Sequence, residues 1–139
     1  MDEEIFSKLE LLGEYIEILK GYKDYSIDDI AQDHTLRGAV ERYLEVSLEC
    51  MIDVGEMIIS RQLLKKPESY KEIFMILGDN GILPQDFSRK ISPAAGFRNV
   101  LVHMYAHIDM ERVYFYLQNH LDDLEQFAHY IAFYLEKSD

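Results

Sequence analysis

The sequence predicts an all-α fold, an antiparallel bundle of four to five main helices. Apolar residues recur at intervals of three and four along most of the chain, the spacing of one face of an α-helix. Only three prolines and seven glycines occur in 139 residues, so few positions interrupt a helix. Hydrophobic residues make up 48% of the chain, enough for a core at this length. We therefore expect a single helical domain over residues 1–139.

The first part of the chain is expected to form a helix over residues 3–22, a capped turn at residues 26–29 and a long helix over residues 35–64. The apolar face of the first helix consists of Ile5, Leu9, Leu12, Ile16 and Leu19. Ser26 is suited to cap the short turn. Thr35 is the expected N-cap of the long helix, because its hydroxyl can accept a hydrogen bond from a free N–H group of the first turn.

Two apolar stripes run along the expected 35–64 helix, which predicts that this helix is the central one. The first stripe consists of Leu36, Val40, Tyr43, Ser47, Met51, Val54 and Ile58, and the second of Leu44, Leu48, Ile52, Gly55 and Ile59. The second stripe faces either another helix of the same chain or a second copy of the protein. The remaining ridge is acidic and consists of Glu41, Glu45, Glu49, Asp53 and Glu56. We interpret this ridge as a solvated face, the alternative being a metal or partner site.

Four more helices are expected, over residues 69–78, 84–91, 93–103 and from 109 to the C-terminus. Each begins at a residue that suits a helix start, namely Ser69, Pro84, the Ser92–Pro93 pair and Asp109. The last helix is predicted to be continuous, with a core stripe of Val113, Leu117, Leu121, Leu124, Phe127, Ile131 and Leu135.

Composition narrows the class of function. The net charge of −12 argues against a protein that binds nucleic acid through a broad basic surface, but not against an enzyme with one local cationic cleft. The chain starts with acidic residues where a secretory signal is basic, and its apolar runs are too short to span a bilayer. The one cysteine, Cys50, permits no internal disulfide and is interpreted as a small core residue. We therefore expect a cytoplasmic protein without membrane contact.

The segment from Gly96 to Tyr105 concentrates the residues with chemical potential. Within eight residues it contains Arg98, Asn99, His103 and Tyr105. Arg98 is permanently cationic and can bind a phosphate through two parallel hydrogen bonds. His103 can give or take a proton near neutral pH.

Residues 98–105 read R-N-V-L-V-H-M-Y, which resembles the R-N-x-L-V-H-x-Y signature of HEPN-domain toxins of the HepT-like family. Further blocks resemble the family in the same order, at residues 37–44, 80–84 and 95–97, so the resemblance covers nearly the whole chain. It implies a homodimeric, metal-independent ribonuclease without a cofactor. It further implies that Tyr105 is adenylylated by a partner, a minimal nucleotidyltransferase antitoxin, which silences the toxin.

The chemistry of the segment suits metal-free RNA cleavage, in which a base activates the ribose 2′-hydroxyl and an acid protonates the leaving 5′-oxygen. His103 suits either proton transfer, Arg98 the charge on the phosphate, and Asn99 a supporting role. Five residues along a helix turn by about 500°, so Arg98 and His103 point about 140° apart. Two copies related by a two-fold axis can bring both kinds of side chain into one cleft.

Three alternatives remain open. Arg98 can instead pair with a carboxylate such as Asp109, with His103 at a helix C-terminus, as a purely structural arrangement. His103, His107 and Asp109 have a spacing that can hold a metal ion. The chain can also be a non-catalytic subunit of a nucleotidyltransferase complex that binds a nucleotide or substrate, and the charge of −12 favours that function.

Overall fold

The computed structural model describes residues 2–103 and 109–137, except for the side chain of residue 2. These residues form α1 (Asp2–Lys20), α2 (Ile27–Gln32), α3 (His34–Arg61), α4 (Tyr70–Asp79), α5 (Gln85–Ile91), α6 (Ala94–His103), α7 (Met110–Asn119) and α8 (Leu121–Lys137). The predicted all-α bundle is confirmed, and the described residues contain no strand. None of these helices is both long and apolar enough to cross a membrane.

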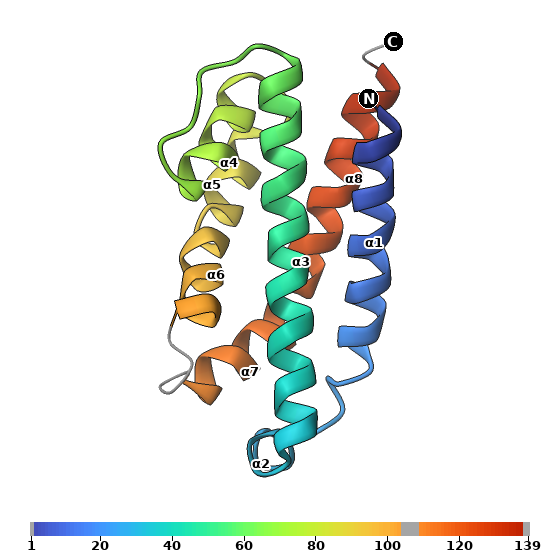
Figure 1. Cartoon of the computed structure of the whole chain (residues 1–139), viewed down its shortest axis with the longest axis vertical. Coiled ribbons are helices and arrows are strands. Elements are labelled where there is room, and N and C mark those ends of the chain that lie inside the picture. The colour runs from blue at the N-terminus through green and yellow to red at the C-terminus, as the bar shows by residue number, and fades with distance from the viewer. Residues whose placement is uncertain (1, 104–108, 138–139) are drawn as a thin grey trace.

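Helix α3 runs through the middle of the molecule (Figure 1). Helices α1 and α8 lie on one side of it, α4, α5 and α6 follow one another on the other side, and α7 crosses below (Figure 1). Both predicted stripes of α3 are largely buried, including Leu44, Leu48 and Ile52 of the second stripe. The second stripe therefore faces other helices of the same chain, which decides one of the alternatives left open by the sequence.

Side-chain caps explain the starts of α2, α3, α4 and α7. Ser26 caps α2 as predicted and forms a capping box with Asp29, and Ser69 accepts a hydrogen bond from the Glu72 amide at α4. The predicted N-cap of α3, Thr35, is wrong by two residues. The N-cap is Asp33, whose carboxylate accepts hydrogen bonds from the amides of Thr35 and Leu36. A carboxylate is a strong N-cap because it adds a negative charge at the positive end of the helix.

Two further helix ends differ from the prediction. Helix α3 ends at Arg61, three residues early, because Leu63 adopts a left-handed conformation with φ of 55° and the Leu64 amide bonds back to the Ile59 carbonyl. Ser92 does not cap α6. Its hydroxyl donates to the carbonyl of Ser88 at 2.7 Å, so it completes α5 instead.

The predicted continuous helix from residue 109 is wrong, because the chain breaks between α7 and α8 at His120. The Asn119 side chain donates to the Phe115 carbonyl, and the His120 ring lies 2.9 Å from the carboxylate of Asp123. These side chains satisfy backbone and polar groups at the junction of the two helices. The predicted core stripe is nevertheless buried throughout, from Val113 to Leu135.

Candidate active site

Helix α6 presents the motif residues and is fixed by its apolar face. Phe97 and Leu101 are buried in the core. Phe97 also stacks on Tyr116 of α7, with ring centroids 4.3 Å apart and an interplanar angle of 17°. Because Phe97 precedes Arg98 directly, this packing fixes the direction in which the Arg98 side chain leaves the helix.

The Arg98 side chain reaches back toward α3 and α4 and is only 17% exposed. Its Nη2 atom lies 3.5 Å from a carboxylate oxygen of Glu49 on α3. Its guanidinium carbon lies 5.0 Å from the centre of the Tyr70 ring at the start of α4, a cation–π contact. The candidate catalytic cation is therefore held between two helices that the motif itself does not include.

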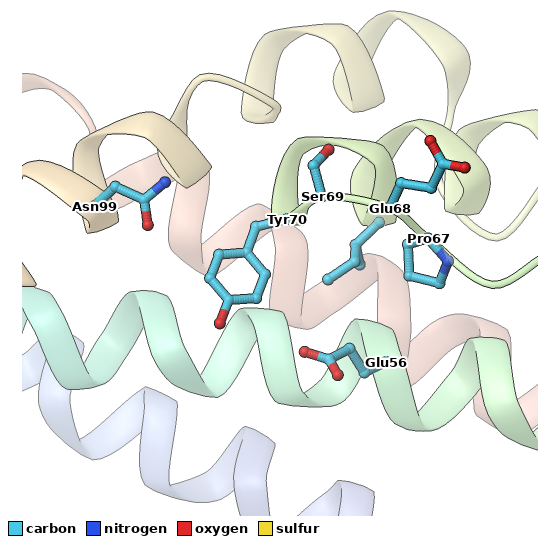
Figure 2. A pocket seen from close by; sticks show the side chains of 7 residues that line it. Glu56, Pro67, Glu68, Ser69, Tyr70 and Asn99 are labelled. Carbon is cyan, nitrogen blue, oxygen red and sulfur yellow. The ribbon is translucent and has the colours of Figure 1, made fainter.

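Asn99 supports Arg98 directly. Its side-chain oxygen accepts a hydrogen bond from Arg98 Nη1 at 3.3 Å. Asn99 is exposed, and it extends from α6 toward Tyr70 beside a pocket of about 370 Å³ (Figure 2). The structure therefore brings Arg98 and Asn99 together, with Tyr70 beside them.

The protein does not satisfy the Arg98 guanidinium completely. Its Nε atom is buried and has no hydrogen-bond partner among the described residues. The contact with Glu49 is a single long one between partly exposed groups, and such pairs contribute little to stability. Arginine binds carboxylates and phosphates most strongly through two parallel hydrogen bonds, and Glu49 makes only one contact here.

His103 is the last residue of α6 and is exposed. Arg98, by contrast, is packed against α3 and α4. Tyr105, the predicted modification site, and His107, part of the alternative metal site, lie outside the described residues. Within the described ranges no three histidine, cysteine, aspartate or glutamate side chains are grouped so that they could hold a metal ion.

The structural alternative for Arg98 has a different partner from the one suggested by the sequence. Asp109 caps α7 by accepting a hydrogen bond from the Glu111 amide at 2.9 Å, and Glu49 takes its place beside Arg98. The sequence analysis assigned Glu49 to a solvated ridge and gave Tyr70 no role, and it missed their contact with Arg98. The available signal was weak, namely that Glu49 is a polar residue on a helix with two apolar stripes.

The acidic ridge of α3 is largely engaged in ion pairs. Its other pairs are Arg37–Glu41 at 3.4 Å, Arg42–Glu45 at 2.8 Å and Lys8–Asp53 at 3.2 Å. Cys50 next to Glu49 is buried, and burial raises the pKa of its thiol to about 11. The thiol is therefore protonated at neutral pH and does not suit a nucleophile.

One protein-family model matches most of the chain. The model described as Ribonuclease HepT-like matches residues 12–131. The chain belongs to this family. The HepT-like chain is 33% identical over 133 residues to a tRNA nuclease HepT of Aphanizomenon flos-aquae, which covers 94% of this chain and 89% of that protein. It is 32% identical over 128 residues to an mRNA nuclease HepT of Shewanella oneidensis, with 91% and 95% covered.

Solved structures agree with this assignment. The HepT-like fold matches a tri-AMPylated HEPN toxin of Shewanella oneidensis, solved in complex with its MNT antitoxin. The TM-score is 0.85 at 31% identity, covering 95% of this chain and 98% of that one. It also matches YutE of Bacillus subtilis, described as a cytosolic protein, with a TM-score of 0.77 at 26% identity over 94% of this chain and 90% of that one.

Proposed function

We propose that this chain is an RNA endonuclease toxin of a toxin–antitoxin pair, cytoplasmic, with one catalytic domain over residues 1–139. Membership of the HepT-like family and relatives named as tRNA and mRNA nucleases support this activity. The observation that carries the proposal is Arg98, a largely buried side chain beside Tyr70 whose carboxylate partner makes a single long contact. Such a group is ready to take a phosphate oxygen.

The proposed reaction needs no metal ion or cofactor. A base takes the proton of the ribose 2′-hydroxyl, and the 2′-oxygen forms a bond to the adjacent phosphorus. The bond from phosphorus to the 5′-oxygen breaks, and an acid protonates that oxygen. Arg98 stabilises the negative charge on the pentacoordinate phosphate, and Asn99 holds Arg98 in place. His103 serves as base or acid.

The placement of the two residues favours a cleft shared by two chains. Arg98 packs inward against α3 and α4, whereas His103 is exposed at the end of α6. A homodimer in which one chain's His103 approaches the other chain's Arg98 supplies both groups, and its two histidines together supply one acid and one base. A local cleft of this kind needs no basic surface, so the charge of −12 is no obstacle.

The partner and its regulation complete the proposal. A minimal nucleotidyltransferase serves as antitoxin and adenylylates Tyr105. The similar HEPN toxin described as tri-AMPylated and in complex with an MNT antitoxin supports this assignment.

Toxicity and cleavage test the activity together. We expect that the wild-type chain expressed alone slows growth and, once purified, cuts RNA in the presence of EDTA. Both effects should be lost in His103→Ala, whose circular dichroism and melting temperature should match the wild type because His103 is exposed. Intact RNA after incubation with folded wild-type protein would contradict the nuclease, and inhibition by EDTA would favour a metal site.

A second candidate function is the non-catalytic subunit that binds a nucleotide or substrate. The pocket beside Asn99 and Tyr70 favours it, because an aromatic ring and an amide can hold a nucleotide without reacting with it. This function predicts nucleotide binding, no RNA cleavage and no growth defect for the wild-type chain. The cleavage assay therefore separates the two candidates directly.

A further inference from the structure

A pocket of about 370 Å³ lies directly beside Arg98, between α3, α4 and α6. Its lining residues are Glu56, Pro67, Glu68, Ser69, Tyr70, Ile73 and Asn99. Arg98 does not line it, but Tyr70 and Asn99 do, and both contact the guanidinium. A group in this pocket therefore lies next to any phosphate that binds Arg98.

We propose that this pocket binds a nucleobase of the RNA adjacent to the phosphate held by Arg98, which rests on the proposed nuclease function. Single-stranded RNA is read by stacking of its bases on aromatic rings and by hydrogen bonds to their edges. Tyr70 supplies the ring, and Glu56 and Asn99 supply polar groups around it (Figure 2). The pocket volume lies at the lower end of the range of about 300–1,000 Å³ for small-molecule sites, which suits one base.

The polar groups predict which bases fit. The Glu56 carboxylate extends from α3 to the side of the Tyr70 ring, whereas the Glu68 carboxylate points away from that ring (Figure 2). An ionised carboxylate only accepts hydrogen bonds, so Glu56 favours a base with an amino group on its edge. Adenine, guanine and cytosine carry such a group. Uracil has no amino group, and its single N3–H donor lies between two carbonyl oxygens that a carboxylate repels, so the pocket selects against uracil.

The charge of the neighbouring surface agrees with this assignment. A second hollow of about 320 Å³ shares Ser69, Tyr70 and Asn99 with the pocket and is also lined by Lys71. The acidic pocket therefore suits a neutral base, and the adjoining hollow offers a lysine to the charged backbone. The two hollows flank Tyr70, as expected for a ring on which a base stacks while its ribose and phosphate continue past it.

Binding of single nucleotides tests the pocket independently of catalysis. The eight ribonucleoside 3′- and 5′-monophosphates of the four bases are titrated into the wild-type chain and followed by NMR. Among the 3′-monophosphates, the 5′-monophosphates or both, the adenosine, guanosine and cytidine nucleotides should bind more tightly than the uridine nucleotide. Glu56→Gln should reduce that preference by about tenfold, the effect of losing a hydrogen bond to a charged group. Tyr70→Leu should weaken all bound nucleotides by about fivefold or more.

Glu68→Gln is the matched control, because it removes the same charge from another residue that lines the pocket, one whose carboxylate points away from Tyr70 (Figure 2). It should leave the base preference unchanged. The pocket assignment is overturned if no nucleotide binds at millimolar concentration, if the four bases bind equally, or if Glu68→Gln acts like Glu56→Gln. Tyr70→Phe, which keeps the ring, should bind like the wild type, and the amide spectrum of Tyr70→Leu in the same NMR titration shows whether that variant is folded.

The outcome also stands apart from that of the nuclease. A chain that shows the base preference but leaves RNA intact contradicts the nuclease and supports the pocket. A chain that cuts RNA, but with equal binding of the four bases, supports the nuclease and overturns the pocket. If both hold, mapped cleavage sites should lack uracil at one position beside the cut, and Glu56→Gln should admit it.

Discussion

At the residue scale, the contact between Arg98 and Glu49 governs how an anion reaches the guanidinium. The carboxylate orients the arginine, but its negative charge also competes with a phosphate for the same donors. The pair has one contact of 3.5 Å, and its side chains are 17% and 34% exposed. The single long contact lacks the second parallel hydrogen bond of a strong arginine–carboxylate pair, so a phosphate that forms two such bonds should displace Glu49.

Glu49→Gln should therefore strengthen RNA binding. The amide keeps an acceptor for Arg98 but removes the competing charge, and the dissociation constant should fall by up to about fivefold at low salt. Fluorescence anisotropy with a labelled RNA, in the His103→Ala background to prevent cutting, measures this. Glu45→Gln is the control, because Glu45 lies one turn away and pairs with Arg42 instead. Weaker binding in Glu49→Gln alone would mean that the carboxylate chiefly positions Arg98.

Tyr105 should be the residue that the antitoxin adenylylates. It follows His103 by two positions, so a nucleotide attached there adds bulk and negative charge near the proposed cleft. The added phosphate should compete with RNA for Arg98 and block cleavage without unfolding the protein. Intact-mass spectrometry after incubation with the nucleotidyltransferase and ATP should show the added mass on the wild type and not on Tyr105→Phe. An adenylate on another tyrosine would contradict this assignment.

The sequence points to candidate catalytic residues but not to the side chains that surround them. Arg98, Asn99 and His103 follow from one short segment and its family resemblance. Glu49 and Tyr70 lie 49 and 28 positions upstream of Arg98 and reach it only because α3 and α4 pack against α6. Such a contact depends on the rotation of each helix about its axis, which the spacing of apolar residues gives only to within a face.

At the element scale, apolar periodicity predicts which faces are buried but not where helices end. The stripe from Val113 to Leu135 is buried on both sides of the break at His120. The break depends on side-chain hydrogen bonds of Asn119, His120 and Asp123, which a helical spacing does not reveal. Caps that depend on a local pattern, such as Ser26 and Ser69, are predicted correctly.

Two glycines of α3 should respond to alanine in opposite directions. A Cβ atom at Gly55 would collide with the Ile73 side chain of α4, whereas one at Gly38 would meet no atom within 4 Å. Gly55→Ala should therefore lower the free energy of unfolding by about 1–3 kcal/mol, as overpacking does. Gly38→Ala should raise it by about 0.5–1 kcal/mol, because alanine favours the helix. Urea denaturation followed by circular dichroism measures both, and equal shifts would contradict close packing of α3 on α4.

At the scale of the whole molecule, the burial of both α3 stripes changes the reasons for expecting a dimer. The second stripe was a possible dimer interface, but the chain covers it with its own helices. What supports a dimer is the separation of Arg98 from His103 on α6. Exposed apolar side chains elsewhere, among them Phe115 at 60% and Phe133 at 57%, remain available for contacts with other chains.

The protein should therefore be a two-fold dimer with the two α6 helices near the axis. Multi-angle light scattering of the His103→Ala protein at tens of micromolar should give twice the mass of one chain, because a specific interface holds at this concentration. A cysteine placed on α6 should form a disulfide with the same cysteine of the second chain, or a spectroscopic label there should show that the two α6 helices are close. A monomer at this concentration that nevertheless cuts RNA would contradict the shared cleft.

Helices α1 and α8 lie side by side, and the first turn of α1 and the last turn of α8 are at the same end of the molecule (Figure 1). Domains with adjacent ends usually tolerate circular permutation. A short linker can join the end of α8 to the start of α1, and the chain can be cut at Gly81 in the turn between α4 and α5. Gly81 is exposed, and its φ of +74° is one that glycine adopts readily. The permuted chain would keep Arg98, Glu49 and Tyr70 on intact helices. The order of the helices along the chain could thus be changed without altering the residues proposed to bind RNA.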